Sequence, residues 1–258
     1  MLRILTRLTA AFFLAAASVH AQQSSRLDDI VKRGTLRVGM TGDYLPFTYL
    51  DKATSKFRGF DVDMAEALGN ALGVKVEYVQ TAWSRLTQDF DADKFDIAMG
   101  GISITPDRQQ HGIFSFPVMR DGKTPIARCA DKDKYQTIAD IDKPGTRVIV
   151  NPGGTNERFA RANVKNAEIT TYSDNVTIFD EIAKGNADLM MTDSSETRYQ
   201  QKLHPGVLCA VHPETPFDVA EKAYWLQRDA AHAAFVDRWL QTVRDSGRFK
   251  QIYAAWFE

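Results

Sequence analysis

The sequence has few of the residues that build metal and redox sites. Its 258 residues include two cysteines and five histidines. The cysteines, Cys129 and Cys209, do not have the spacing of metal ligands, and the histidines are scattered along the chain. A metal site would have to combine ligands from distant parts of the sequence. We therefore predict no metal centre.

An excess of charge of either sign is also missing. The formal net charge is -1 at pH 7, and no tract of lysine and arginine stands out. Domains that bind nucleic acids present a basic patch or stripe. The sequence therefore predicts no nucleic-acid partner, and we expect a small molecule as the partner instead.

Long apolar runs are absent as well. A helix that spans a bilayer needs about 20 consecutive apolar residues, and no run in this chain approaches that length. A shorter apolar run follows Arg3 and Arg7 and ends in the small-residue pattern Val-His-Ala at 19–21. This arrangement is typical of a signal peptide. We predict that residues 1–21 direct export and that the mature chain begins near Gln22, without stable membrane insertion.

Export bears on the two cysteines and on domain organisation. In an oxidising compartment, Cys129 and Cys209 are expected to form one structural disulfide rather than to supply a thiol nucleophile. The roughly 235 residues of the mature chain suit one large domain or two smaller ones. Length alone leaves that choice open.

Strand-like and helix-like segments alternate along the mature chain, which predicts α/β lobes with largely parallel sheets. Strands are expected at 36–40, 74–79, 95–99, 148–150 and 187–191, and helices at 60–72 and from 81 to about 91. Polar or glycine-rich segments follow three of these strands, at 100–101, 151–156 and 192–196. Open α/β sheets place their ligands at such carboxyl ends. The ligand site is therefore predicted where these segments meet.

Three ordered motifs connect the chain to a known family. The segments GDYLPF at 42–47, GFDVDMA at 59–65 and ISITPDR at 102–108 resemble the amino-acid-binding family of periplasmic solute-binding proteins, and the resemblance spans the mature chain. It implies a periplasmic protein with a two-lobed, Venus-flytrap fold and a hinge of two crossover strands. One lobe would comprise 22–123 plus 218–258, and the other 124–217.

Further segments are similar to those of one enzymatic branch of that family, the periplasmic cyclohexadienyl dehydratases. These segments are DGKTP at 121–125, NPGGTNE at 151–157, DNVTIF at 174–179, MMTD at 190–193 with Glu196, and PFD at 216–218 with EKAY at 221–224. The resemblance implies a carbon–oxygen lyase without a cofactor. It would convert prephenate to phenylpyruvate, and arogenate to phenylalanine, with loss of water and carbon dioxide.

Glu196 carries the sharpest hypothesis. The pattern Asp193-Ser194-Ser195-Glu196 by itself favours a capping box, in which the glutamate only caps a helix. The resemblance implies instead that Glu196 is the general acid that protonates the departing hydroxyl. A helix N-terminus lowers a carboxyl pKa, so this role needs desolvation when the cleft closes. We hypothesise an ordinary carboxylate in the open state and an acid of raised pKa in the closed state. Ser194 and Ser195 depart from the dehydratase pattern, and they either hydrate the acid or cap the helix.

Arg108 and the segment after the fourth predicted strand are candidate anion-binding groups. Arg108 follows Ser103 and is implied by the family motif to hold a ligand carboxylate, which a guanidinium matches with two parallel hydrogen bonds. The alternative is a surface arginine at the start of a helix. Asn151 and the following turn would direct backbone amides at an anion, or Thr155 is simply a helix N-cap. We predict that Arg108 and this turn hold the substrate's side-chain carboxylate.

Asp193 is also consistent with a second function. The family resemblance implies that it binds a ligand ammonium, which fits arogenate but not the keto acid prephenate. The alternative function is accordingly a non-catalytic amino-acid-binding component of an ABC transporter. A sensor or interaction module is a third, for which no additional signalling segment is visible. The sequence does not fix the preference between the two substrates or the oligomeric state, a homo-oligomer included.

The remaining candidates are weaker. Trp83 would wall the substrate ring, or simply pack near a helix start. Lys123 lies at the predicted first crossover, where it would face an anion or remain a solvated hinge lysine. Tyr44 and Phe47 are cleft walls by family analogy alone.

Overall fold

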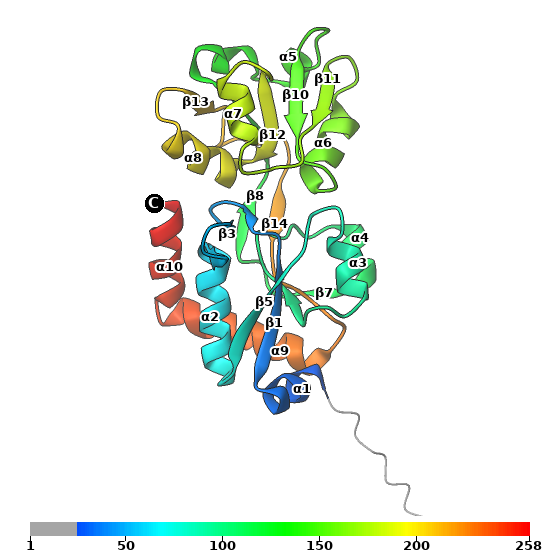
Figure 1. The fold of residues 1–258 in the computed structure, drawn as a ribbon, viewed down its shortest axis with the longest axis vertical. Coiled ribbons are helices and arrows are strands. Elements are labelled where there is room, and N and C mark those ends of the chain that lie inside the picture. Colours follow the sequence, from blue (N-terminus) through cyan, green and yellow to red (C-terminus); the bar gives the residue numbers. More distant parts are fainter. Residues whose placement is uncertain (1–24) are drawn as a thin grey trace, which may run out of the picture.

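Two five-stranded sheets, one in each lobe, organise residues 25–258, the part of the chain that this computed structural model describes (Figure 1). The predicted signal peptide, residues 1–21, lies outside the described residues. No helix within 25–258 is long and apolar enough to cross a bilayer.

The first sheet belongs to the lobe that contains the C-terminus. Its strands lie in the order β5 (Lys75–Gln80), β1 (Thr35–Met40), β6 (Ile97–Ala98), β15 (Trp225–Leu226) and β7 (Ile113–Phe114). A small antiparallel sheet beside it contains β2 (Asp43–Tyr44), β3 (Thr48–Asp51) and β4 (Lys56–Arg58). The helices of this lobe are α1 (Arg26–Arg33), α2 (Phe60–Leu72), α3 (Leu86–Asp91), α4 (Pro106–His111), α9 (Ala230–Asp245) and α10 (Arg248–Phe257).

The second sheet forms the core of the other lobe. Its strand order is β11 (Glu168–Thr171), β10 (Arg147–Val150), β12 (Leu189–Asp193), β9 (Lys123–Arg128) and β13 (Leu208–Ala210). The helices here are the 3-10 helix η1 (Cys129–Lys134), α5 (Ile138–Ile141), α6 (Thr155–Asn163), α7 (Ile178–Ala183) and α8 (Ser194–Leu203).

Two short antiparallel strands connect the lobes: β8 (Met119–Asp121) and β14 (Ala220–Lys222) (Figure 1). Asp121 is paired with Ala220, and Met119 with Lys222. The pair lies close to the boundaries that we propose for the lobes, 22–123 plus 218–258 and 124–217. Lys222 additionally forms a bridge with Ser103, so the hinge reaches the loop that follows β6.

Helix α2 shows how local sequence positions an element. Its buried side chains, among them Met64 and Leu68, recur at helical spacing and pack into the core of the first lobe. Burying a side chain of this size contributes about 1.5–3 kcal/mol. Gly73 ends the helix in the left-handed conformation at φ 68°, which glycine adopts without steric cost. The predicted helix at 60–72 is therefore confirmed.

Three structural details differ from the sequence prediction. Each sheet is largely parallel as predicted but includes one reversed strand, β15 in the first sheet and β9 in the second, which runs antiparallel to both of its neighbours. The helix expected from 81 begins at Leu86, since the amide of Thr81 still bonds to Met40 and extends the sheet pairing. Strand β12 includes Thr192 and Asp193, because both pair with β9.

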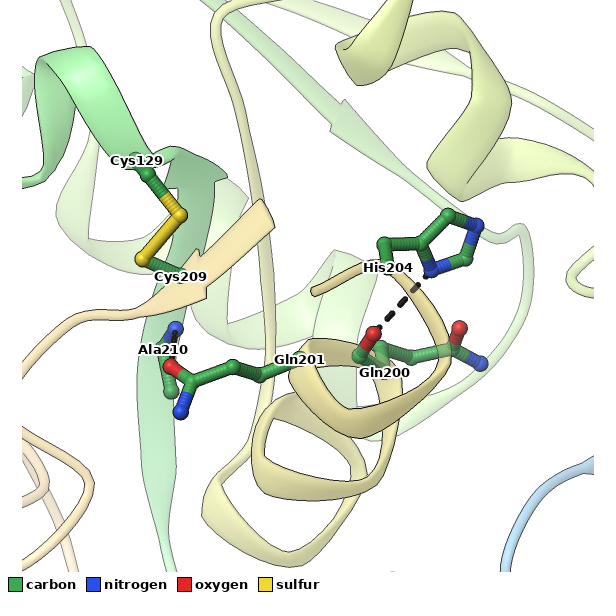
Figure 2. Close-up of a disulfide and its surroundings, with 6 residues drawn as sticks. All are labelled: Cys129, Gln200, Gln201, His204, Cys209 and Ala210. Carbon is green, nitrogen blue, oxygen red and sulfur yellow. Dashed lines mark hydrogen bonds between the residues drawn. A yellow bond between two sulfur atoms is a disulfide. The ribbon is translucent and has the colours of Figure 1, made fainter. Parts of the chain in front are cut away.

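The predicted disulfide between Cys129 and Cys209 is present (Figure 2), with an S–S distance of 2.12 Å. It joins η1 to the edge strand β13. The neighbouring amide of Ala210 donates to Gln201 of α8 at 2.9 Å, so the same edge is also tied to that helix (Figure 2).

Candidate active site

A small cavity lies between the two lobes. Six of the predicted site residues line it, and four further residues complete the wall. The predicted ones are Tyr44, Trp83, Ser103, Asn151, Thr155 and Asp193; the others are Gly101, Gly154, Asn156 and Lys222. Segments that follow β6 and β10 and the end of β12 contribute to the wall, so the carboxyl ends of strands meet here as expected.

Asp193 is the centre of a buried charge cluster. Its Oδ1 accepts from Lys123 Nζ at 2.7 Å, and its Oδ2 accepts from Lys222 Nζ at 2.8 Å and from the hydroxyl of Tyr44. Burial by itself would raise the pKa of Asp193, but the two ammonium groups outweigh burial and hold that pKa far below its usual range. Asp193 is therefore a carboxylate under all ordinary conditions.

Lys123 supports the cavity from behind rather than lining it. Its ammonium donates to Thr155 Oγ1 at 2.9 Å, to Asn156 Oδ1 at 2.5 Å and to Asp193, which uses all three of its donors. Burial lowers the pKa of Lys123. The solvated-lysine alternative is wrong, because only 2% of the residue is exposed.

Sequence analysis assigned no role to Lys222, and it treated Asn156 only as part of the anion-binding turn after Asn151. Asn156 Nδ2 donates to Asn151 Oδ1 and to Thr192 Oγ1, each at 3.0 Å, and so connects α6 to β12. Lys222 is 1% exposed, and its ammonium donates to Ser103 Oγ at 2.9 Å as well as to Asp193. A fully buried lysine is rare. The only sequence signal was that both residues fall inside the dehydratase-like segments.

Glu196 is fully buried on the first turn of α8. Its Oε2 accepts from the hydroxyl of Thr192 at 2.5 Å, whereas its Oε1 is buried without a partner among the described residues. Burial raises the pKa of Glu196 well above its usual range; the Thr192 hydroxyl opposes that shift, and the charge of Asp193 adds to it. The environment therefore favours the protonated acid.

The capping-box interpretation of this segment is wrong. Asp193 occupies the N-cap position but makes no side-chain capping bond, since the lysines and Tyr44 engage its oxygens. Asp121 of the hinge caps α8 instead: its carboxylate accepts from the hydroxyls of Ser194 at 2.7 Å and Ser195 at 2.5 Å. The two serines thus bind the cap and not the acid.

Arg108 is buried on α4, with 4% of the residue exposed, so the surface-arginine alternative is wrong. One guanidinium nitrogen donates to the carbonyl of Ser103 at 2.8 Å, and Thr105 caps the helix. Burial lowers the pKa of Arg108 to about 10, and the nearby positive charge of Arg158 contributes. Arg108 stands behind Ser103 and does not line the cavity itself.

No side chain caps the N-terminus of α6, so this helix end can bind a ligand. Gly154 is the N-cap and makes no side-chain capping bond, and Thr155 is the first helical residue. The interpretation of Thr155 as the N-cap is therefore wrong. With Asn151 and Gly154, Thr155 lines the cavity, so this helix end faces it. Such a helix end attracts anions through its unpaired amides and its dipole.

Aromatic residues form one wall of the cavity. Trp83 meets Tyr44 edge to face at 5.5 Å, and its indole donates to Asp43 Oδ1 at 3.0 Å. Phe47 was expected to be a cleft wall as well. It is instead fully buried behind Tyr44, stacked on that ring at 5.0 Å and packed against Phe257 in the core of the first lobe.

The lobes contact each other around the cavity, so the structure represents a closed state. Asn175 of one lobe is 1% exposed and donates to the carbonyl of Asp43 of the other at 2.9 Å. Lys52 and Asp174 form an ion pair across the cleft at 3.3 Å. Within residues 25–258, no group of histidine, cysteine and carboxylate side chains has the geometry of a metal site.

Two lobes, a hinge of paired strands and a closed cavity with buried charges define a protein of the solute-binding type. Residues 36–258 match the model of bacterial extracellular solute-binding proteins, family 3, and the chain belongs to this family. The resemblance predicted from the motifs is thereby confirmed.

The chain is also similar to individual members. It is 54% identical over 245 residues to a cyclohexadienyl dehydratase of Pseudomonas aeruginosa, covering 95% of this chain and 90% of that protein. It shares 37% identity and a TM-score of 0.84 with the crystal structure of an ancestral amino acid-binding protein, a precursor of cyclohexadienyl dehydratase, over 91% of this chain and all of that one. An ancestral cyclohexadienyl dehydratase is 49% identical over 91% of this chain and 97% of its own, with a TM-score of 0.57.

Proposed function

We propose that this protein is a cyclohexadienyl dehydratase, a carbon–oxygen lyase, and that Glu196 is its general acid. The observation that carries the proposal is the fully buried carboxyl of Glu196, whose Oε1 has no partner among the described residues. The 54% identity to a cyclohexadienyl dehydratase supports it. A protein that only binds and releases a ligand has no use for a buried acid of this kind, since burying an unpartnered polar oxygen costs stability.

In the proposed reaction on prephenate, the bond between the ring carbon and the hydroxyl oxygen breaks while Glu196 transfers its proton to that oxygen, which leaves as water. The carbon–carbon bond to the ring carboxylate also breaks. Its electron pair enters the ring, and the carboxylate leaves as carbon dioxide. The ring becomes aromatic, which supplies the driving force, so no cofactor is needed. Glu196 regains a proton from solvent before the next turnover.

The proposed substrate contacts follow from the cavity. Asn151 and Thr155, which line the cavity, hold the side-chain carboxylate, with the N-terminus of α6 contributing its amides. Arg108 does not line the cavity in this closed state, and we propose that its buried positive charge attracts the same carboxylate from behind Ser103. Trp83 and Tyr44 enclose the ring, and Ser103 borders it. The ring carboxylate lies in the less ionic part of the cavity. Holding it as tightly in the ground state as in the transition state would not accelerate its loss.

The environment of Glu196 suits proton donation in the closed protein. A general acid works best when its pKa lies near the working pH, and burial moves the Glu196 pKa upward from the ordinary glutamate range. The Thr192 hydroxyl orients the carboxyl through Oε2 and leaves Oε1 free to carry the transferred proton. We propose that opening of the lobes admits water and returns this pKa toward its ordinary value.

The family is one of extracellular solute-binding proteins, and we propose that residues 1–21 direct this chain to the periplasm. The disulfide between Cys129 and Cys209 fits an oxidising compartment. The proposed partners are the small molecules prephenate and arogenate.

The test compares turnover with simple binding. The purified mature protein is incubated with prephenate at neutral pH, and phenylpyruvate is followed by its absorbance. In parallel, thermal unfolding is measured with a panel of amino acids. We expect rapid formation of phenylpyruvate. No turnover together with a raised unfolding temperature in one amino acid would make the protein a transport receptor and overturn the proposal.

A further inference from the structure

The hinge strand β8 ends beside the first turn of the helix that carries Glu196. Asp121 is the last residue of β8, is 6% exposed and is paired with Ala220 of the other hinge strand. Its Oδ1 accepts from the hydroxyl of Ser194 at 2.7 Å and from the amide of Ser195 at 3.2 Å, and its Oδ2 accepts from the hydroxyl of Ser195 at 2.5 Å. One hinge carboxylate therefore binds the first two residues of α8 with three hydrogen bonds.

The backbone beside this contact is held as well. The amide of Gly122 donates to Asp121 Oδ1 at 2.9 Å, and the carbonyl of Gly122 accepts from the amide of Ser194 at 2.9 Å. A Cβ at Gly122 would collide with the carbonyl oxygen of Asp218, so this stretch of backbone is packed closely against the segment that leads into β14. The end of the hinge strand and the start of α8 are thus joined by both side-chain and main-chain bonds.

Glu196 has few contacts of its own that could fix its position. It follows Ser195 directly on the first turn of α8. Its carboxyl accepts one hydrogen bond, from Thr192 at 2.5 Å, and its Oε1 has no partner among the described residues. The position of this carboxyl therefore depends on the backbone that carries it, and the bonds to Asp121 hold that backbone.

The influence of Asp121 on Glu196 is geometric rather than electrostatic. After burial, the pKa of Glu196 is shifted most by four groups on β2, β9 and β12: the Thr192 hydroxyl, Asp193, Asp43 and Lys123. The two aspartates raise that pKa, and the threonine and the lysine lower it. The charge of Asp121 is not among these main contributions. A substitution of Asp121 should therefore act on Glu196 by displacing it.

Resting on the proposed dehydratase function, we infer that Asp121 is a positioning residue that ties the acid helix to the hinge and holds Glu196 where it donates its proton. A displacement of about 1 Å between reacting groups can cost about 100-fold in rate. This role also explains Ser194 and Ser195, which depart from the dehydratase pattern. Their hydroxyls bind the hinge carboxylate and so strengthen the link between hinge and helix.

The experiment separates the length of the Asp121 side chain from its charge. Asp121→Ala removes the contact. Asp121→Asn keeps the length and one acceptor oxygen without the charge, whereas Asp121→Glu keeps the charge and adds one methylene, for which the second cavity beside Asp121 provides space. Asp229→Ala is the control, because Asp229 caps α9 in the first lobe by accepting from the amide of His232 at 2.7 Å. Steady-state kinetics on prephenate are measured across pH, and thermal unfolding verifies that each variant is folded.

We expect Asp121→Ala and Asp121→Glu to lower kcat by about tenfold or more, and Asp121→Asn to keep it within about threefold of the native value. KM should change by less than about threefold, since the anion-binding residues Asn151 and Thr155 lie on another segment. The high-pH limb of kcat should move toward the ordinary glutamate range in Asp121→Ala. Asp229→Ala should lose stability and keep both kcat and the limb.

Two results would overturn the inference. The first is a folded Asp121→Ala with native kcat and an unmoved limb; if that variant does not fold, native kcat in Asp121→Glu has the same meaning. The second is a loss of activity in Asp121→Asn as large as in Asp121→Glu, because the charge and not the geometry would then be what matters.

The same role can be tested without substrate, which separates it from the proposed function. Urea denaturation gives the effect of Glu196→Gln on the free energy of unfolding as a function of pH, in the native and the Asp121→Glu backgrounds. We expect this effect to depend less on pH in the second background, since a displaced Glu196 is better solvated. Absence of prephenate turnover by the native protein would overturn the dehydratase proposal alone. Rapid turnover together with the same pH dependence in both backgrounds would remove only the role of Asp121.

Discussion

Thr192 donates a hydrogen bond to Glu196 Oε2 at 2.5 Å, and the other oxygen of that carboxyl is buried with no partner among the described residues. Thr192 in turn accepts from Asn156, which lines the cavity. Glu196 is therefore oriented by one defined contact within a network that reaches the cleft. Because the carboxyl is buried and no described residue donates a hydrogen bond to Oε1, its acid form is favoured and can donate the proton.

The first prediction concerns the pH dependence of turnover. Glu196 must be protonated to act, and burial raises its pKa above the ordinary glutamate value of about 4.3. The turnover rate should therefore be maximal at low pH and should fall only as the pH rises through the raised pKa of Glu196. We expect kcat for prephenate, corrected for the spontaneous reaction, to decline on a limb well above the ordinary glutamate range. A limb at the ordinary value would show that Glu196 is not desolvated during catalysis.

A second prediction links the same group to stability without any assay of activity. The pKa of Glu196 is higher in the folded protein than in the unfolded chain. Its contribution to the free energy of unfolding is therefore largest below the pKa of the unfolded chain, and it is lost as the pH rises through the pKa of the folded protein. Glutamine cannot titrate. The free energy of unfolding of Glu196→Gln relative to the native protein should therefore increase with pH across this interval, measured by urea denaturation.

The control for that series is Glu168→Gln, which replaces an exposed carboxyl on β11 of the same lobe. Its stability relative to the native protein should stay nearly constant with pH. A constant difference for Glu196→Gln as well would contradict a raised pKa in the folded protein.

Closure of the cleft can be tested at two glycines with the same backbone conformation. Gly153 and Gly185 both have φ at 81°, so alanine costs each about 1–2 kcal/mol of backbone strain. A Cβ at Gly153 would lie 2.5 Å from Cα of Ser84 in the opposite lobe, whereas at Gly185 it would meet nothing within 4 Å. Gly153→Ala therefore holds the lobes apart, and Gly185→Ala does not.

We expect both alanine variants to lose similar stability and only Gly153→Ala to lose activity, by about tenfold or more in kcat/KM, since small displacements of reacting groups are costly. Steady-state kinetics on prephenate and thermal unfolding measure the two effects. Equal activity of the two variants would show that contact between Gly153 and Ser84 is not required for turnover.

Much of the fold could be predicted because its signals are local. Helix α2 has its apolar spacing and its terminal Gly73 within 14 consecutive residues, and the strand at 36–40 is part of β1. The one reversed strand in each sheet could not be predicted in this way. The direction of β9 and β15 depends on how the chain crosses between lobes, which no local pattern encodes.

The site residues also differ in whether local sequence could predict them. Five residues from the motifs line one cavity together with Trp83, which was proposed from its position after a strand. The five are Tyr44, Ser103, Asn151, Thr155 and Asp193. The capping-box pattern at 193–196 was misleading because distant lysines engage Asp193: Lys123 lies 70 residues away and Lys222 lies 29 residues away. Lys222 itself gave no local signal, since a lysine in a short strand normally indicates a solvated edge. Its burial follows from the hinge pairing alone.

The most direct test of the account is prephenate turnover by Glu196→Gln, measured together with prephenate binding and with Glu168→Gln as the control. The glutamine keeps the shape of the carboxyl and removes the proton that is donated. We predict that turnover falls by about 100-fold to 10,000-fold, the contribution of a general acid, while the dissociation constant for prephenate changes by less than about threefold. Turnover within tenfold of the native protein, at unchanged affinity, would contradict the assignment of Glu196 as the acid.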